Sequence, residues 1–268
     1  MRLSIGKAWD ETSTFLKREA RLVAPVALAT FALPAVLDAW AYPAGLARGG
    51  AGWLMILVLL AVLVGQMTVV LLVNGWRESI GQAMGKAARR VPVLVAALIL
   101  IFLPIALIAT VALGSALVGA GLTDPAAVTP AALMKVPGLK WMVLLFALLF
   151  LFLGTRLFVA SATAVSEPVG PIALIRRSWS LTRGSFWRLL ALFLLLMLVG
   201  LILNAAVTTV VGSVATLAAG EARPFNTSAL IVALAGGLVG AMVSTVSAAM
   251  AGRVYAQLAA PEASVPAS

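Results

Sequence analysis

Six long apolar stretches set the hydrophobic pattern of the chain. They cover residues 22–42, 53–73, 91–118, 141–165, 187–215 and 229–258. Each has about 20 residues or more, which is the helix length needed to cross ~30 Å of hydrocarbon. None has the regular polar face of a surface helix in a soluble domain. The pattern predicts an all-α fold, a polytopic transmembrane bundle of about six spanning helices that forms one domain over residues 1–260.

Three polar segments precede the odd-numbered spans and have helical periodicity of their own. They run from Ser4 to Arg21, from Ser79 to Arg90 and from Gly170 to Arg188. Each places apolar residues on one helical face and basic residues on the other, a pattern typical of helices that lie in the membrane interface. We therefore expect cytoplasmic amphipathic interfacial helices and a threefold internal repeat of helical hairpins.

Residues at the ends of these segments predict where the helices begin and end. Ser4 and Ser79 are suited to N-caps, because a serine hydroxyl can accept a hydrogen bond from a free amide of the first turn. Pro171 is suited to a first helical turn, and Gly184 to a helix end.

The composition supports a membrane protein and excludes several chemistries. The chain is 63% hydrophobic and 10% charged, whereas soluble domains are ~45–50% apolar and ~25% charged. It contains neither Cys nor His. Disulfides, haem and the common zinc sites lack their ligands, and the usual general base at neutral pH is missing. We expect no cofactor, no metal and no enzymatic activity.

The basic residues indicate how the chain is oriented. Of the 19 Lys and Arg residues, all but four lie in the N-terminal segment, after the second span, around the end of the fourth span and in the sixth span. The four others are Arg48, Lys135, Lys140 and Arg223. The positive-inside rule then places both termini in the cytoplasm, with residues 261–268 as a disordered tail. Because the basic residues flank apolar spans, anionic lipid is the expected partner rather than nucleic acid.

Two charged residues near the end of the fourth span are candidates for function. Arg156 lies within apolar sequence, where a cation must reach the interface or find a partner. It could snorkel, anchor the bundle to a carboxylate or bind a ligand. Glu167 could pair with Arg176, Arg177 or Arg188 and fix the turn, and an ion pair of this kind is favoured over proton transfer.

Small and polar residues predict helix packing in the last two spans. Asn204 is the most central polar residue of the fifth span and could hydrogen-bond to another helix or contact a substrate. The sixth span repeats a small residue at every fourth position, which allows close helix contact within the bundle or with a second subunit. These positions are Gly236, Gly240, Ser244, Ala248 and Gly252.

The stretches 156–160 and 165–188 resemble a known signature. Its most characteristic part is Ala-Leu-x-Arg-Arg-Ser-Trp-x-Leu-Thr-x-Gly-x-Phe-Trp at residues 173–187. This motif is similar to the membrane domain that some bacterial glycerophosphodiester phosphodiesterases carry ahead of their hydrolase, and to the stand-alone YciC-like inner-membrane proteins. The resemblance implies a multi-span fold in the bacterial inner membrane. No phosphodiesterase domain follows the sixth span here, so we do not expect that activity.

These observations predict a non-enzymatic inner-membrane protein that binds anionic lipid headgroups or a protein partner, which could be a second copy of the chain. The expected binding residues are Arg156, Glu167, Arg176, Arg177, Trp179, Arg183, Trp187 and Arg188. The alternative is a small transporter or lipid flippase with a polar site near Arg156 and Asn204.

Overall fold

The computed structural model describes residues 3–41, 52–122, 124, 129–133 and 136–263, which form helices and turns with no strand among them. The helices are α1 (Ile5–Arg18), α2 (Ala20–Ala27), the π-helical η1 (Leu28–Ala32), α3 (Leu33–Ala41), α4 (Gly52–Val73), α5 (Ile80–Gly119), α6 (Pro130–Leu133), α7 (Leu139–Leu157), α8 (Ala160–Ser166), α9 (Pro171–Arg183), α10 (Phe186–Ala219) and α11 (Thr227–Ala263). Within these residues, six helical segments are long and apolar enough to cross a membrane. The prediction of an all-α fold with six helices able to span a membrane is confirmed.

Helices α5 and α11 extend furthest beyond the limits that the sequence predicted. The third span has no separate helix before it, because α5 continues without interruption from Ile80 to Gly119, about 60 Å at ~1.5 Å per residue. At the other end of the chain, α11 runs to Ala263. Residues 261–263 of the predicted disordered tail are therefore helical, and residues 264–268 lie outside the described part of the chain.

Two spans contain a break that hydropathy did not predict. The first span consists of α2, η1 and α3, and in the wider π turn the Thr30 hydroxyl donates a hydrogen bond of 2.7 Å to the carbonyl of Val26. Gly65 of α4 packs against this turn so closely that a Cβ there would lie 2.8 Å from the Phe31 ring. The fourth span is interrupted at Phe158 and Val159, between α7 and α8.

The larger of two buried apolar clusters lies at the end of the molecule that holds α8, and the smaller one lies between η1, α4 and α11. All residues from Ala160 to Val165 are buried. Met67 and Val70 of α4, Ala87 of α5 and Val254 of α11 belong to the larger cluster. Small side chains in α8 let the surrounding helices approach it closely.

The last helix, α11, packs against α10, α3, α4 and α1. At Gly252 a Cβ would lie 2.6 Å from Val73 of α4, and at Gly236 it would lie 3.6 Å from Thr208 of α10. Ala248 is fully buried, whereas Gly240 has no neighbour within 4 Å of its Cβ position. The small residues thus pack on helices of the same chain at several positions of the predicted ladder.

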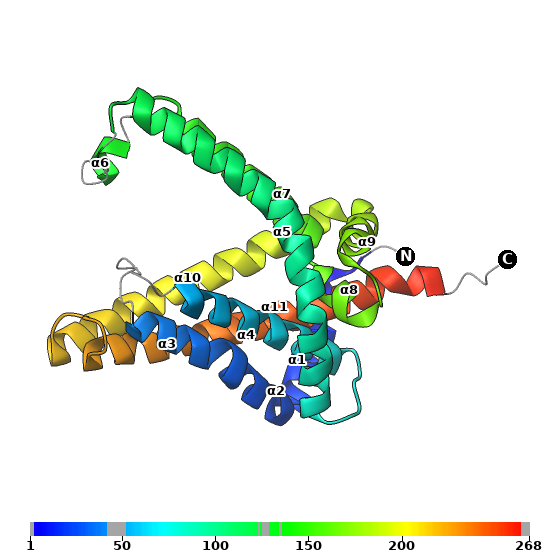
Figure 1. The fold of residues 1–268 in the computed structure, drawn as a ribbon. Coiled ribbons are helices and arrows are strands. Elements are labelled where there is room, and N and C mark those ends of the chain that lie inside the picture. The colour runs from blue at the N-terminus through cyan, green and yellow to red at the C-terminus, as the bar shows by residue number, and fades with distance from the viewer. Residues whose placement is uncertain (1–2, 42–51, 123, 125–128, 134–135, 264–268) are drawn as a thin grey trace.

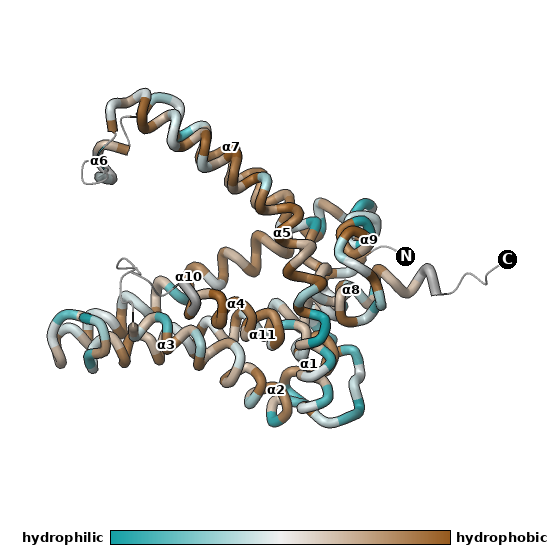
Figure 2. The backbone as a smooth tube through the Cα atoms, in the orientation of Figure 1, coloured by the Kyte–Doolittle hydropathy of each residue, from teal (hydrophilic) through white to brown (hydrophobic). Residues whose placement is uncertain are grey.

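The hairpin of α5 and α7 diverges from the other spans (Figure 1). Prolines inside a helix remove backbone hydrogen bonds and bend it, and α5 contains Pro92 and Pro104. Both termini lie at the end that carries α8 and α9, whereas α6 and the α10–α11 turn lie at far ends (Figure 1). Hydrophilic residues gather on α1, on the α4–α5 turn and on α9 (Figure 2).

The helix ends predicted from the sequence are confirmed. The Ser4 hydroxyl accepts a hydrogen bond from the Lys7 amide, and Ser79 forms a reciprocal capping box with Gln82. Pro171 occupies the first turn of α9, and Gly184 caps its C-terminus.

Candidate functional site

A cluster of polar and aromatic side chains lies where α7, α8, α9, α11 and the start of α10 meet. We call it the end cluster, and its members are Phe152, Arg156, Glu167, Arg177, Ser178, Trp179, Thr182, Phe186 and Tyr255. The break after α7 returns the chain toward α4, and the next turn starts α9. This path brings residues that are up to 103 positions apart in the sequence into one site.

Arg156 is held by aromatic rings. Its guanidinium carbon lies 5.0 Å from the ring centroid of Phe186, 5.4 Å from that of Trp179 and 5.5 Å from that of Phe152. The electron-rich face of an aromatic ring attracts a cation, and this attraction is stronger where water is excluded. The rings therefore take the place of the carboxylate that the sequence allowed as an anchor.

Two hydroxyl groups of α9 complete the surroundings of Arg156. Its Nη1 donates to Thr182 Oγ1 over 3.4 Å, and the Ser178 hydroxyl donates to the Arg156 carbonyl over 2.7 Å. The second bond satisfies a carbonyl that the break after α7 leaves without a helical partner. Arg156 Nε is buried and has no hydrogen-bond partner among the described residues. The arginine thus joins α7 to α9 without an ion pair.

Glu167 forms the ion pair that the sequence favoured. Arg177 Nε donates to both carboxylate oxygens, at 3.0 and 3.1 Å, and both side chains are about three-quarters buried. The Tyr255 hydroxyl donates to Glu167 Oε1 over 2.8 Å. Since Glu167 follows α8, Arg177 lies on α9 and Tyr255 on α11, this carboxylate fixes three helices to one another.

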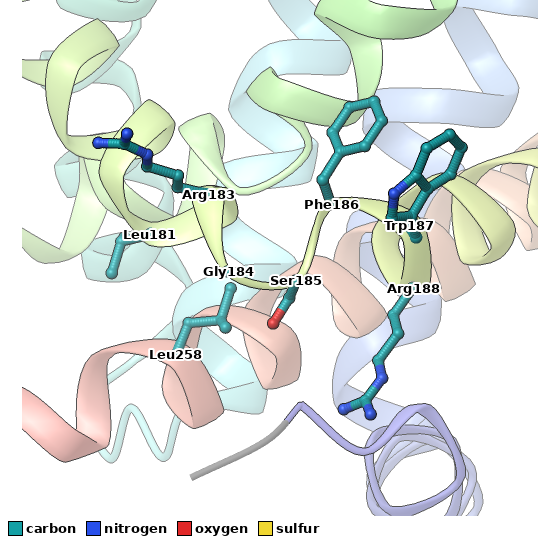
Figure 3. A pocket seen from close by; sticks show the side chains of 8 residues that line it. All are labelled: Leu181, Arg183, Gly184, Ser185, Phe186, Trp187, Arg188 and Leu258. Carbon is teal, nitrogen blue, oxygen red and sulfur yellow. The ribbon is translucent and has the colours of Figure 1, made fainter.

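A hollow of about 510 Å³ opens beside the end cluster, at the turn between α9 and α10 (Figure 3). Its walls include Arg183, Trp187, Arg188 and Leu258. Arg188 extends toward the N-terminal segment, where its Nη1 donates to the Leu3 carbonyl over 2.8 Å. Arg183 and Trp187 are exposed, and Trp187 presents 78% of its surface. Basic and aromatic groups therefore face outward around this hollow.

A second basic surface lies at the α4–α5 turn. Lys86 Nζ is 4.9 Å from the ring centroid of Trp76, and both line a hollow of about 600 Å³ together with Arg89 and Arg90. The sequence indicated this region as basic but did not predict the contact between lysine and tryptophan.

The predicted site residues fall into three groups. Arg156 and Trp179 meet in the aromatic cage, Glu167 and Arg177 form the ion pair, and the others are Arg176, Arg183, Trp187 and Arg188, which lie toward the surface. Asn204 is not part of this site. It lies on α10, exposed, next to Gly236. It is 18 residues beyond Phe186, about 27 Å along the helix, so the structure does not bring Asn204 and Arg156 together.

Five members of the end cluster were not predicted: Phe152, Ser178, Thr182, Phe186 and Tyr255. Phe152 precedes Arg156 by four residues on one helix, a spacing that brings side chains together and could have indicated the contact. Phe186 lies on α10 and Tyr255 on α11. Sequence periodicity does not show which helices meet at the site. Among the described residues, no group of three or more Asp or Glu side chains converges to hold a metal ion.

Comparisons with known proteins give no match: no family model, no curated protein and no solved structure matches this chain.

Proposed function

We propose that this chain is a non-enzymatic multi-pass protein of the bacterial inner membrane, with both termini in the cytoplasm, and that it binds anionic phospholipid headgroups at the turn between α9 and α10. The observation that carries the proposal is the exposure of Arg183, Trp187 and Arg188 around one hollow. Arg176 is also exposed and lies two turns before Arg183 on α9. The excess of basic residues at this end of the bundle supports the orientation.

The exposed face of α9 suits a negatively charged surface. Ile172, Arg176 and Arg183 fall within about 40° of one another on the helix, since each residue turns it by ~100°. A basic residue near an anionic leaflet contributes ~1 kcal/mol to binding, and tryptophan favours the interface. Ile172 and Trp187 could therefore enter the leaflet while the arginines contact phosphate groups.

The start of α10 adds backbone donors to this surface. Ser185, which precedes the helix, does not cap it with its side chain. The first amides of a long helix carry a partial positive charge and bind phosphate oxygens readily. Arg183 before this turn and Arg188 after it would increase the preference for an anion.

The proposal also includes that the chain is related to the YciC-like inner-membrane proteins and that its hairpins form a threefold repeat. Residues 173–187, which carry the resemblance, form α9 and the turn at the centre of the surface. α1, the first three turns of α5 and α9 each precede an odd-numbered span. A transporter with one polar site near Arg156 and Asn204 is less well supported, because about 27 Å of α10 separates Asn204 from Phe186, the ring that Arg156 contacts.

The experiment compares lipid retention between charge-reversed variants. The double variant Arg176→Glu/Arg183→Glu is purified beside Lys140→Glu/Arg223→Glu, which makes the same charge change at the opposite ends of the spans. Each protein is placed in nanodiscs of mixed phosphatidylglycerol and phosphatidylcholine, and retained lipids are counted by native mass spectrometry.

We expect the first variant to lose its preference for phosphatidylglycerol and the second to keep it. An equal loss in both variants would show a nonspecific effect of net charge. An unchanged preference in both, with a protein co-purifying only with the unmodified chain, would favour a protein partner. Either result contradicts the lipid proposal.

A further inference from the structure

Two hydrogen bonds fix the N-terminal segment to the wall of the hollow at the α9–α10 turn. Arg188 Nη1 donates to the Leu3 carbonyl over 2.8 Å, and the Ser4 amide donates to Gln257 Oε1 over 3.1 Å. Arg188 lines the hollow, and so does Leu258, the residue that follows Gln257. We call Leu3 and Ser4 the latch, because they are held by residues at the edge of the site.

Arg188 is the group that the latch and an anion would both use. The Leu3 carbonyl is its hydrogen-bond partner, and the guanidinium forms no ion pair with any described residue. A phosphate group can accept two parallel bonds from one guanidinium and carries the opposite charge, whereas a carbonyl has no net charge. A phosphate in the hollow would therefore compete with Leu3 for Arg188.

The second cation of the hollow, Arg183, indicates that the two contacts exclude each other. Arg183 is exposed and has no ion-pair partner among the described residues either. Figure 3 shows the two arginines extending in different directions, with Arg188 reaching toward the N-terminal segment. A single phosphate held by both guanidinium groups requires Arg188 to turn away from the Leu3 carbonyl.

The latch is held firmly enough to compete with an anion and weakly enough to be released. The Leu3 side chain is only 4% exposed and belongs to the larger apolar cluster, which favours docking. Gln257 Nε2 opposes it, because this nitrogen is buried without a partner among the described residues and an unpaired buried donor is costly. Since the latch precedes α1, its release leaves the hydrogen bonds within that helix in place.

We propose that the latch regulates the anion site: a headgroup phosphate in the hollow takes Arg188 from the Leu3 carbonyl and releases Leu3 and Ser4 from α11. This inference rests on the proposed function, which supplies the anionic lipid. Coupling between two binding events is reciprocal, so release of the latch must strengthen phosphate binding by the same factor.

The first test measures the latch while the lipid is changed. The protein is placed in nanodiscs of phosphatidylcholine with or without phosphatidylglycerol, and hydrogen exchange is followed by mass spectrometry in the peptide that contains Leu3 and Ser4. We expect phosphatidylglycerol to speed this exchange about fivefold or more, the usual scale of coupling between sites. Arg188→Gln keeps a donor for the carbonyl but has no charge for the phosphate, so its exchange should be equal in both lipids.

The second test measures the lipid while the latch is changed. Leu3→Ala weakens docking without altering a residue that lines the hollow. Leu16→Ala makes the same change at the other end of α1, where the side chain packs on the smaller apolar cluster. Retained lipids are counted by native mass spectrometry. We expect Leu3→Ala to raise the preference for phosphatidylglycerol by the factor found in the exchange experiment, and Leu16→Ala to leave it unchanged.

The possible failures of the latch and of the lipid site can be told apart. A preference for phosphatidylglycerol with unchanged exchange in the unmodified protein would overturn the latch and leave the proposed function standing. A weaker preference in Leu3→Ala would do the same, since the N-terminal segment would then support the site. No preference in either the unmodified protein or Leu3→Ala would overturn the proposed function, and the latch with it.

Discussion

Tyr255 of α11 donates a hydrogen bond of 2.8 Å to Glu167, the carboxylate that follows α8 and accepts from Arg177 of α9. The two residues are 88 positions apart in the chain. Their contact closes the end of the bundle, because it joins the last span to the turn that follows the fourth span.

Removing only the tyrosine hydroxyl should weaken this closure. We expect Tyr255→Phe to lower the free energy of unfolding by about 1–2 kcal/mol, since a hydrogen bond to a charged group contributes ~1.5–3 kcal/mol and the pair is partly exposed. Arg177→Ala should cost more, because it leaves Glu167 without its cation. Unfolding in detergent measures the free energy of unfolding of each variant. The double variant shows whether the two losses of stability are coupled. Equal stability of Tyr255→Phe and the unmodified protein would show that the bond contributes nothing.

The aromatic cage predicts that Arg156 cannot be replaced by lysine. A guanidinium stacks flat on aromatic rings, whereas an ammonium on a flexible chain does so poorly. We expect Arg156→Lys to destabilise the protein by about 1–2 kcal/mol, the scale of partly desolvated cation–π contacts. The control is Arg183→Lys at an exposed position, which should change stability by less than about 0.5 kcal/mol. Equal melting temperatures of the two variants would argue against the cage as a stabilising contact.

Two glycines should respond in opposite directions to the same substitution. At Gly65 a methyl group would collide with Thr30 and with the Phe31 ring, so we expect Gly65→Ala to cost about 1–3 kcal/mol. At Gly85 of α5 no atom lies within 4 Å of the new carbon. Alanine there removes glycine's entropy cost in a helix and should stabilise by ~0.5–1 kcal/mol. Thermal unfolding of both variants checks the difference in sign.

The absence of cysteine makes the orientation easy to measure. We expect Ala222→Cys, in the α10–α11 turn, to react with a membrane-impermeant maleimide added outside intact spheroplasts. Ser180→Cys, on the exposed face of α9, should react only after lysis, because that end faces the cytoplasm in the proposed topology. The reverse pattern would place both termini outside.

The spans and helix ends could be predicted because their causes are local. A run of about 20 apolar residues specifies a spanning helix wherever it occurs, and Ser79 caps α5 with a partner only three residues away. The break at Phe158 and Val159 has no local sign, because apolar and small residues continue on both sides of it. The π turn before Leu33 likewise depends on packing against Gly65.

The site was predictable in part for the same reason. The pairing of Glu167 with an arginine of the following helix needed only ten residues of chain, and the structure has it at Arg177. The rings around Arg156 come from three helices, α7, α9 and α10. Hydropathy locates each helix but does not give its rotation, and the rotation decides which rings face the guanidinium.

The small-residue ladder of α11 also sets the angle around the helix axis between its contacts with two neighbouring helices. Four residues turn a helix by about 400°, so successive members of the ladder advance by about 40° around the axis. Over the four steps from Gly236 to Gly252 this amounts to about 160°, which matches the change of neighbour from α10 to α4. A single residue added or lost between them would turn the two contacts about 100° out of phase. The number of residues between the glycines, and not only their small size, therefore determines how the last helix fits between two partners on nearly opposite sides.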